Sequence, residues 1–349
     1  MAGIEIFKYP ISSPADISPL RSLENEGYSS SDIVAVIGKT EGNGCVNDFS
    51  RTLAAHVWES QIPSTAVTVF SGGTEGVLCP HVTLLVQARQ HTGLLACSGR
   101  TRELRPDEIG TMDQSGEVND TVSHMITEAG VTKESVRLVL IKCPLLTSTA
   151  IESIRKTGQT PITTDTYESM ARSRYASSVG IALSLGEIQP DKVSATLVQS
   201  QEEAVWSARA SCSSGAELNN CHVLILASDP GETPGRLRAT SGYMKDAMDG
   251  GVLLDMMNRI NEQKGNVVQV FAKAEADPSG SIRGLRHTMN TDSDIHSTRH
   301  ARAAVGGLVA GLVGDSAVYV SGGGEGQGPP GGGSLCIIYS CRSSGICTE

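Results

Sequence analysis

The chain has 349 residues, which exceeds the roughly 100 to 200 residues of a typical domain, so we expect two or three modules that share buried faces. Its formal net charge of −10 argues against nucleic-acid and anionic-membrane partners, because both need a basic face. Only 4% of the residues are aromatic, so the core must consist mainly of Val, Ile, Leu and Ala.

No secretory leader and no membrane-spanning segment are expected. The first residues show no charged stretch followed by an apolar core, and the apolar segment from Ala303 to Val320 contains Asp315 and several glycines. Nine cysteines without a CxxC pair are typical of reduced thiols that pack as small core residues. These features predict a cytoplasmic protein without disulfide bonds.

Three segments of the chain share one order of features, namely a strand-like apolar run beside a lysine, a helical pattern with an arginine, and a serine four residues before a glutamate. In chain order, the strand-like runs are 32–42 with Lys39, 136–146 with Lys142 and 267–276 with Lys273. The helical patterns are 47–58 with Arg51, 167–183 with Arg174, and 294–313 with Arg299 and Arg302. The serines are Ser71 in SGGTE, Ser213 in SSGAE and Ser321 in SGGGE.

This recurrence predicts an α/β chain of three related units, at 1–90, 91–230 and 234–349. The linkers between them are expected at Gln90 to Thr92 and at Asp229 to Gly235, where DPGETPG marks a break. Three such units around a pseudo-threefold axis would bring all three Lys-Ser pairs to one centre.

Such a centre would suit nucleophilic catalysis by serine. A serine hydroxyl becomes a nucleophile when a base takes its proton, and a lysine serves as that base only if its pKa falls toward neutrality. Several buried cations in one pocket lower each other's tendency to stay charged. The same cations would hold an anionic, carbonyl-rich ligand, and the glycines after the serines would let main-chain N–H groups approach an oxyanion.

The local sequence suggests that the three lysines differ. Lys142 lies in VRLVLIKCPLL, the most continuously apolar setting, where desolvation should lower its pKa furthest. Lys39 and Lys273 lie within two residues of Glu41 and Glu275, which we expect to keep them protonated. We therefore predict that Lys142 is the neutral base and that the other two lysines act as fixed positive charges.

Long motifs give the chain a family resemblance. The segments are GKTEGNGCVNDFSR, SGGTEGVLCPH, KCPLL, TTDTYESM, FAKAEA, DSDIHSTRHARA and YVSGGGEGQGPPGGG. They resemble the cyanuric acid hydrolase and barbiturase family, and the resemblance runs from about Ile4 to about Ile338. It implies a pseudo-threefold barrel of three α/β units with a central active site, which hydrolyses a small cyclic imide.

The resemblance also implies roles for individual residues. Ser213 would be the nucleophile and Lys142 its base. The residues implied to hold the ring are Lys39, Arg51, Ser71, Gly72, Arg174, Ser214, Lys273, Arg302, Ser321 and Gly322. The family often has SAG in the middle unit where this chain has Ser214, so the effect of that extra hydroxyl on ring binding is open.

A structural Mg²⁺ or Ca²⁺ is implied at the glycine-rich loop, and no organic cofactor is expected. Its implied ligands are mostly backbone oxygens and one carboxylate, from Glu275, Gly324, Gln327, Gly328, Pro329 and Gly332. One frame, Gly326, Gly328 and Gly331, also satisfies GxGxxG. Two prolines fall inside it and no helical pattern follows, so dinucleotide binding is not expected.

Several alternatives remain open at this point. Cys212 is a rival nucleophile, although strand alternation would turn it away from the side of Ser213. His296 and His300 have the i, i+4 spacing of a zinc pair, but HExxH and a nearby third ligand are missing, so we expect surface or supporting histidines.

The substrate also stays open at this point. Cyanuric acid is favoured over barbituric acid, and a non-catalytic binder of cyclic metabolites is a further possibility. We also expect a homotetramer.

Overall fold

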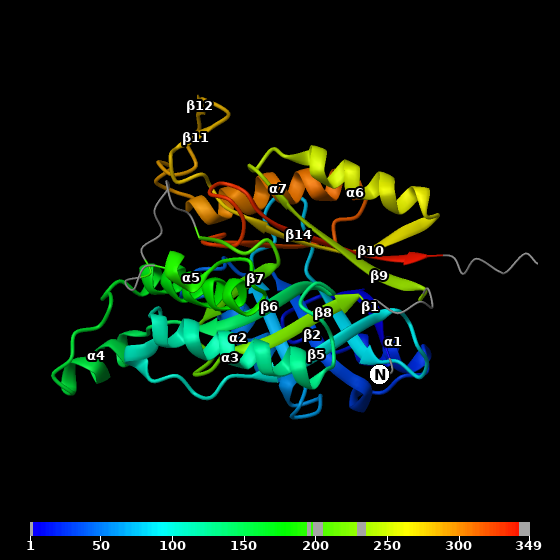
Figure 1. Cartoon of the computed structure of the whole chain (residues 1–349), viewed down its shortest axis with the longest axis horizontal. Helices are drawn as coiled ribbons and strands as arrows, with labels where there is room; N and C mark the ends of the chain where they lie inside the picture. The colour runs from blue at the N-terminus through cyan, green and yellow to red at the C-terminus, as the bar shows by residue number, and fades with distance from the viewer. Residues whose placement is uncertain (1–2, 194–196, 198–204, 229–234, 342–349) are drawn as a thin grey trace, which may run out of the picture.

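The computed structural model describes residues 3–193, 197, 205–228 and 235–341 (Figure 1). It contains three four-stranded sheets and one two-stranded sheet. The first four-stranded sheet has the order β1 (Ile4–Pro10), β4 (His81–Gln87), β2 (Ile33–Thr40), β3 (Val67–Gly72). The second has the order β5 (Leu94–Arg100), β8 (His222–Ser228), β6 (Val136–Pro144), β7 (Ala210–Gly215). The third has the order β9 (Leu237–Met244), β14 (Gly333–Cys341), β10 (Gly265–Ala274), β13 (Tyr319–Gly322).

Seven α-helices occur in the described residues, together with the small sheet of β11 (Ser281–Ile282) and β12 (Leu285–Arg286). The helices are α1 (Pro19–Asn25), α2 (Phe49–Glu59), α3 (Met112–Glu128), α4 (Ser148–Lys156), α5 (Thr166–Ser184), α6 (Gly250–Glu262) and α7 (Ser297–Val313). Side chains that accept hydrogen bonds from the first helical turn fix where several of them begin. Asp48 caps α2, Asp165 caps α5 and His296 caps α7.

The three four-stranded sheets have the same topology. Counted in chain order, the second strand of each sheet pairs in parallel with the third and antiparallel with the fourth, and the fourth pairs antiparallel with the first. The predicted α/β architecture is therefore confirmed. The expected barrel is not a closed sheet, because within the described residues each sheet ends at its own edge strands and meets the others through side chains.

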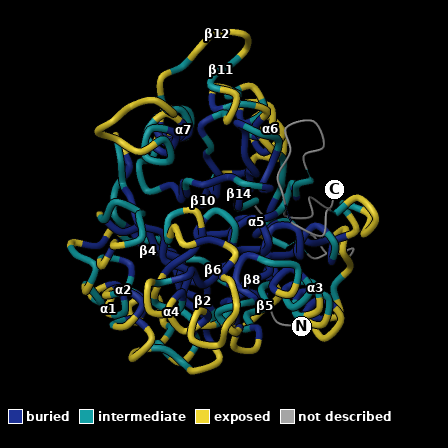
Figure 2. The backbone as a smooth tube through the Cα atoms, turned by 90° about the vertical axis from the view of Figure 1, so that its left-hand side faces the viewer, coloured by how far each residue is buried: buried dark blue, intermediate teal, exposed yellow. Residues whose placement is uncertain are grey.

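The sheets share one core on their inner faces and have separate cores on their outer faces. Alternate residues of each strand point to opposite sides, so that Ile37, Leu140 and Phe271 join one cluster with residues of all three sheets. Val36, Ile141 and Val270 point outward into clusters with the helices of their own sheet. In Figure 2 the buried segments gather where the sheets meet, and the exposed ones lie on the outer loops.

The predicted strands around Lys39, Lys142 and Lys273 are confirmed as β2, β6 and β10, and the predicted helices as α2, α5 and α7. The predicted linker at Gln90 to Thr92 lies between β4 and β5, and most of the linker predicted from Asp229 falls outside the described residues. The eight cysteines in the described part of the chain are free thiols. No helix in that part is long and apolar enough to cross a membrane.

Candidate active site

Each predicted lysine lies directly beside its predicted serine. In the parallel strand pairs, Lys39 is opposite Ser71 in β2 and β3, and Lys142 is opposite Ser213 in β6 and β7. Lys273 is opposite Ser321 in β10 and β13. Because each lysine lies an even number of residues after the inner-face residues of its strand, all three point to the shared centre.

A small inner cavity joins residues of all three units. Its lining contains the three serines, Lys142, the three predicted arginines and the residues that follow the serines. The lining residues are Gly44, Arg51, Ser71, Gly72, Lys142, Met170, Arg174, Ser213, Ser214, Arg302, Ser321 and Gly322. Lys39 and Lys273 are fully buried beside it, each hydrogen-bonded to a lining serine. The structure thus brings together every residue that the sequence predicted to hold the ring.

The three arginines reach this cavity from α2, α5 and α7, and each meets a glutamate of another unit. Arg174 and Glu325 form two contacts of 2.8 Å, and Arg302 forms contacts of 2.7 and 2.8 Å with Glu75. Planar guanidinium groups suit such paired oxygens, so these carboxylates fix Arg174 and Arg302 in one orientation.

The Lys-Ser dyads of the first and third units, called the outer dyads, are hydrogen-bonded, and the Lys142–Ser213 dyad of the middle unit is not. Lys39 Nζ donates to Ser71 Oγ at 3.2 Å, and Lys273 Nζ donates to Ser321 Oγ at 3.1 Å. The hydroxyls of Ser71 and Ser321 also bond to each other at 3.2 Å. Ser213 Oγ is buried without a hydrogen-bond partner among the described residues.

Lys142 makes other contacts instead. Its Nζ donates to the carbonyl oxygens of Phe70 at 2.9 Å and Ser214 at 3.2 Å, and it lies 3.3 Å from Glu217 Oε1. Proton transfer from Ser213 therefore requires a turn of the serine hydroxyl or of the lysine side chain toward the other.

The pKa values of the three lysines all fall, chiefly because burial penalises the charged form. The pKa of Lys142 is lowered to about 8, and that of Lys273 to about 7. That of Lys39 is lowered well below its usual value. A nearby arginine adds to each shift, as the clustering of cations predicted.

The prediction that desolvation lowers the pKa of Lys142 furthest is not reproduced, because burial lowers the pKa of all three lysines and that of Lys273, at about 7, lies below that of Lys142, at about 8. Burial is complete at all three, and Glu217 partly restores the charged form of Lys142. Glu41, predicted to keep Lys39 protonated, is exposed, and Glu75 has that influence instead. Likewise Glu325, and not Glu275, acts on Lys273. Burial therefore lowers the pKa of Lys39 and Lys273 as well, and the glutamates next to them in the sequence do not offset it.

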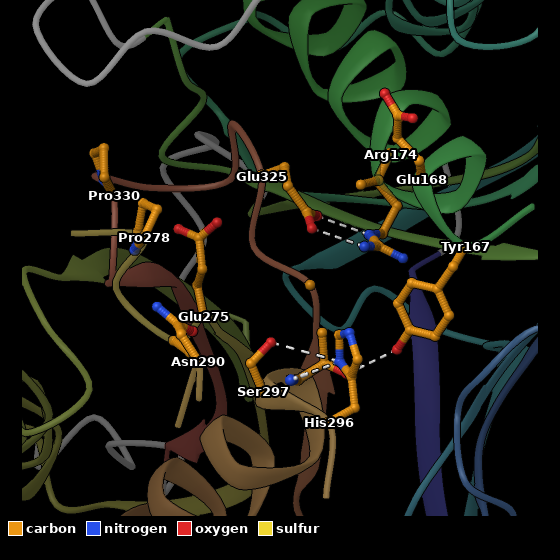
Figure 3. A pocket seen from close by; sticks show the side chains of 14 residues that line it. Tyr167, Glu168, Arg174, Glu275, Pro278, Asn290, His296, Ser297, Glu325 and Pro330 are labelled. Carbon is orange, nitrogen blue, oxygen red and sulfur yellow. Dashed lines mark hydrogen bonds and ion pairs between the residues drawn. The ribbon is translucent and has the colours of Figure 1, made fainter. Parts of the chain in front are cut away.

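An outer cavity of about 630 Å³ lies beside the inner one, and the Arg174–Glu325 pair belongs to its wall (Figure 3). The Tyr167 ring lies 4.3 Å from the His296 ring, and the Tyr167 hydroxyl is 3.4 Å from Thr298 Oγ1. Arg174 lines both cavities, so the two cavities adjoin at this side chain.

Comparisons with known proteins agree with this geometry. The model of the amidohydrolase ring-opening protein family matches residues 5–340. The chain belongs to this family. A cyanuric acid amidohydrolase of a Sarocladium species is 62% identical over 97% of this chain and 99% of its own length. One of a Rhodococcus species is 53% identical over 100% of this chain and 99% of its own length.

Solved structures of the ring-opening amidohydrolase family have the same fold. One cyanuric acid hydrolase, described as an evolutionary innovation by structural concatenation, superposes with a TM-score of 0.90 at 40% identity, over 98% of this chain and 100% of that one. The cyanuric acid hydrolase of A. caulinodans superposes with a TM-score of 0.91 at 39% identity, over the same shares.

Two groups of site residues were missed by the sequence analysis of this family member. Glu75, Glu217 and Glu325 recur four residues after the serines, so their signal was visible, but they were given no role. Tyr319 is buried on the inner face, and the hydroxyls of all three serines act on the pKa of its phenol, which burial raises. No repeat marks it, since Val69 and Ser211 occupy the matching strand positions.

The rival candidates fall outside this cavity. Cys212 points to the opposite side of β7, into the core cluster of the outer face, where burial raises its thiol pKa well above the usual value. His296 caps α7 and His300 contacts Asp292 at 2.9 Å. The described residues contain no group of three His, Cys, Asp or Glu side chains that could hold a metal.

The glycine-rich loop lies between β13 and β14, beside Glu275. Gly331 N–H donates to Glu275 Oε2 at 2.9 Å, and strand β14 follows the loop directly, so the helix that dinucleotide binding requires is missing there. Burial and the nearby Glu325 raise the pKa of Glu275 to about 7.

Proposed function

We propose that the protein is a cyanuric acid amidohydrolase, which opens the s-triazine ring of cyanuric acid to carboxybiuret. The observation that carries the proposal is the convergence of three Lys-Ser pairs and three arginines on one cavity. Cyanuric acid has three equivalent carbonyls, so a threefold set of donors matches the ring. The relatives named above carry the same activity in their names.

Ser213 is the proposed nucleophile and Lys142 the proposed base. Of the three serines only Ser213 has a hydroxyl without a hydrogen-bond partner in the described part of the chain. Lys142, with a pKa of about 8, is poised near neutrality, where a general base works best. The ammonium that forms when Lys142 takes the serine proton is stabilised by Glu217 at 3.3 Å.

The reaction then proceeds in two stages. The Ser213 oxygen attacks a ring carbonyl carbon, the ring C–N bond breaks, and the leaving nitrogen takes the proton from Lys142. Water then attacks the acyl-enzyme, releases carboxybiuret and returns the proton to Ser213. Carboxybiuret loses CO₂ to give biuret.

The other two serines and the arginines hold the ring in this proposal. Main-chain N–H groups next to Ser71 and Ser321, where Gly72 and Gly322 have no side chain in the way, suit the carbonyl oxygens. Arg51, Arg174 and Arg302 supply further donors from their helices. Lys39 and Lys273 support Ser71 and Ser321 through hydrogen bonds.

A structural Mg²⁺ or Ca²⁺ fits the loop after Ser321. Burial, and to a smaller extent the nearby Glu325, raise the pKa of Glu275, and a cation beside this carboxylate would favour its charged form. The proposed ligands are Glu275, Gly324, Gln327, Gly328, Pro329 and Gly332, and the cation would stabilise the loop rather than take part in the reaction. Homotetramer formation, a cytoplasmic location and the three unit boundaries remain predictions.

The test is to incubate the purified protein with cyanuric acid, barbituric acid, uracil and hydantoin, and to follow the loss of ring absorbance and the formation of biuret. We expect turnover of cyanuric acid. Faster opening of barbituric acid would favour a barbiturase, and tight binding of cyanuric acid without turnover would indicate a binding protein.

A further inference from the structure

The Arg–Glu pairs of the site link the three units in a cycle. Glu75 of the first sheet's unit contacts Arg302 on α7, and Glu325 after β13 contacts Arg174 on α5. Glu217 after β7 completes the cycle with Arg51 on α2. Each glutamate therefore faces the arginine of a different unit, and a strict threefold repeat would make the three pairs equivalent.

The third pair is not equivalent. Arg51 Nε lies 3.6 Å from Glu217 Oε2, beyond hydrogen-bond distance, and the Arg51 Nη2 atom donates instead to the Cys45 carbonyl at 2.7 Å. The Glu217 side chain is only 7% exposed, yet neither of its oxygens has a hydrogen-bond partner in the described residues. A buried carboxylate in that state is costly unless a cation lies close to it.

That cation is Lys142, whose Nζ lies 3.3 Å from Glu217 Oε1. Among the described ion pairs, no other lysine of the site reaches a carboxylate. Glu75 and Glu325 have both oxygens occupied by their arginine forks.

The turn after the serine gives a local reason for this difference. Gly73 and Gly323 have φ of +99° and +77°, and an arginine guanidinium packs so closely on each that a Cβ would lie 2.5 Å from it. The matching residue in the middle unit, Gly215, has no positive φ, and a Cβ there would lie 2.2 Å from Glu217 Oε2. The glutamate side chain therefore folds back over its own strand end toward Lys142, in the place that an arginine guanidinium takes at Gly73 and Gly323.

We propose that Glu217 is a positioning residue that holds the Lys142 side chain in place and so assigns the chemistry to the middle one of three otherwise matched dyads. The inference rests on the proposed function, and it adds the reason why a repeated site works asymmetrically. Glu217 does not line the inner cavity, so it acts through Lys142 and Arg51 and not on the ring.

The charged and titratable groups that face Lys142 set its pKa, which the experiment follows. They are Glu217, Arg51, Cys143 and His222, and Glu217 has the largest effect among them on the Lys142 pKa, in the upward direction. Loss of the Glu217 charge should therefore lower that pKa by about one unit or more. Because the base acts when neutral, the acid limb of the rate profile should move to lower pH.

The experiment compares Glu217→Gln with the matched variants Glu75→Gln and Glu325→Gln. For each, the rate at which an electrophilic cyclic carbamate labels Ser213 is measured against pH by mass spectrometry, alongside kcat and KM for cyanuric acid. For Glu217→Gln we expect the midpoint of the labelling rate against pH to lie at lower pH than in wild type, and kcat to be reduced about tenfold or more. The two matched variants should keep the midpoint and raise KM, because their arginines are loosened.

An unchanged midpoint in Glu217→Gln would overturn the inference, as would an equal shift in all three variants. Glu217→Asp retracts the charge by one methylene and should give a midpoint between those of wild type and Glu217→Gln. If Glu217→Gln does not fold, an unshifted midpoint in Glu217→Asp is the contradicting result. A shifted labelling midpoint in a protein that leaves cyanuric acid intact would sink the proposed function alone, and wild-type protein without labelled Ser213 would contradict both.

Discussion

The middle dyad and the two outer dyads have the same residues in the same strand register, but their hydrogen bonds differ. Lys39 and Lys273 donate hydrogen bonds to their own serines, and those two serines also bond to each other. Lys142 donates to two main-chain oxygens and forms an ion pair with Glu217, and the Ser213 hydroxyl has no hydrogen-bond partner among the described residues. Equivalent backbones therefore present three chemically different side-chain settings.

This difference shows where catalytic asymmetry arises in a repeated fold. The sheets place the dyads, and residues around them decide which hydroxyl is available and which lysine can take and return a proton. The three nonequivalent features of the middle unit are Ser214 in place of a glycine, Gly215 without a positive φ, and Glu217 beside Lys142.

Removal of the proposed nucleophile should have the largest effect. Ser213→Ala should lower kcat by at least about 10³-fold, because an activated nucleophile is lost, and it should leave ring binding largely intact. Steady-state kinetics and calorimetric titration with cyanuric acid would measure both. Ser71→Ala and Ser321→Ala should each cost about tenfold in kcat/KM, the effect of one hydrogen bond to the ring. Ser213→Ala turnover within tenfold of wild type would make the dyads interchangeable.

Loss of the proposed base should come next. Wild-type kcat/KM should rise with pH through about 8, since Lys142 accepts a proton only when neutral and its pKa is about 8. Lys142→Met should lose roughly 10² to 10⁴-fold, and higher pH should not restore the loss. A pH–rate profile of each protein measures this. Recovery of Lys142→Met at high pH would show that hydroxide or another lysine replaces Lys142.

The loop beside the outer dyad of Ser321 should matter more for stability than for chemistry. If Glu275 holds a cation, added Mg²⁺ or Ca²⁺ should stabilise the wild-type fold by about 2 to 4 kcal/mol at saturating concentration. Glu275→Gln should lose this response in thermal melting, with kcat reduced far less than in Ser213→Ala. A chelator-treated protein with an unchanged melting temperature and full activity would contradict the proposed cation.

The smallest effect is expected at Ser214, where the outer units have glycines. Its hydroxyl receives a hydrogen bond from Arg174 at 3.3 Å and donates one to the Met170 carbonyl at 3.3 Å. Ser214→Ala removes two long hydrogen bonds, so we expect KM to rise by less than about tenfold with kcat nearly unchanged. Michaelis–Menten kinetics would check this, and a large fall in kcat would place the Ser214 hydroxyl in the reaction itself.

The strands, helices and inward placement of the lysines and serines were predictable, because period-2 alternation and repeated motifs are local properties of the sequence. The predicted effects of Glu41 and Glu275 on the lysine pKa values were wrong, because that prediction also relied on neighbours in the sequence. Neighbours in sequence are not neighbours across a sheet edge, and the contacts that set the Lys39 and Lys273 pKa values come from Glu75 and Glu325.

Features that depend on how the units pack could not be predicted. The cyclic Arg–Glu contacts join residues about 150 to 230 positions apart, as in Arg174 with Glu325 and Arg302 with Glu75. Tyr319 reaches the three serines from a single unit, so no repeat pointed to it. The expected closed barrel is not found, because the three sheets meet through side chains and each keeps its own edge strands in the described residues.

Covalent labelling tests most directly whether one dyad carries the chemistry. Wild-type protein would be treated with an electrophilic cyclic carbamate near pH 8, digested and quantified by mass spectrometry at Ser71, Ser213 and Ser321. The free hydroxyl of Ser213 and the nearby Lys142 predict label on Ser213 alone, and its loss in Lys142→Met. Comparable labelling of Ser71 or Ser321 would contradict the assignment and show that the three dyads are interchangeable.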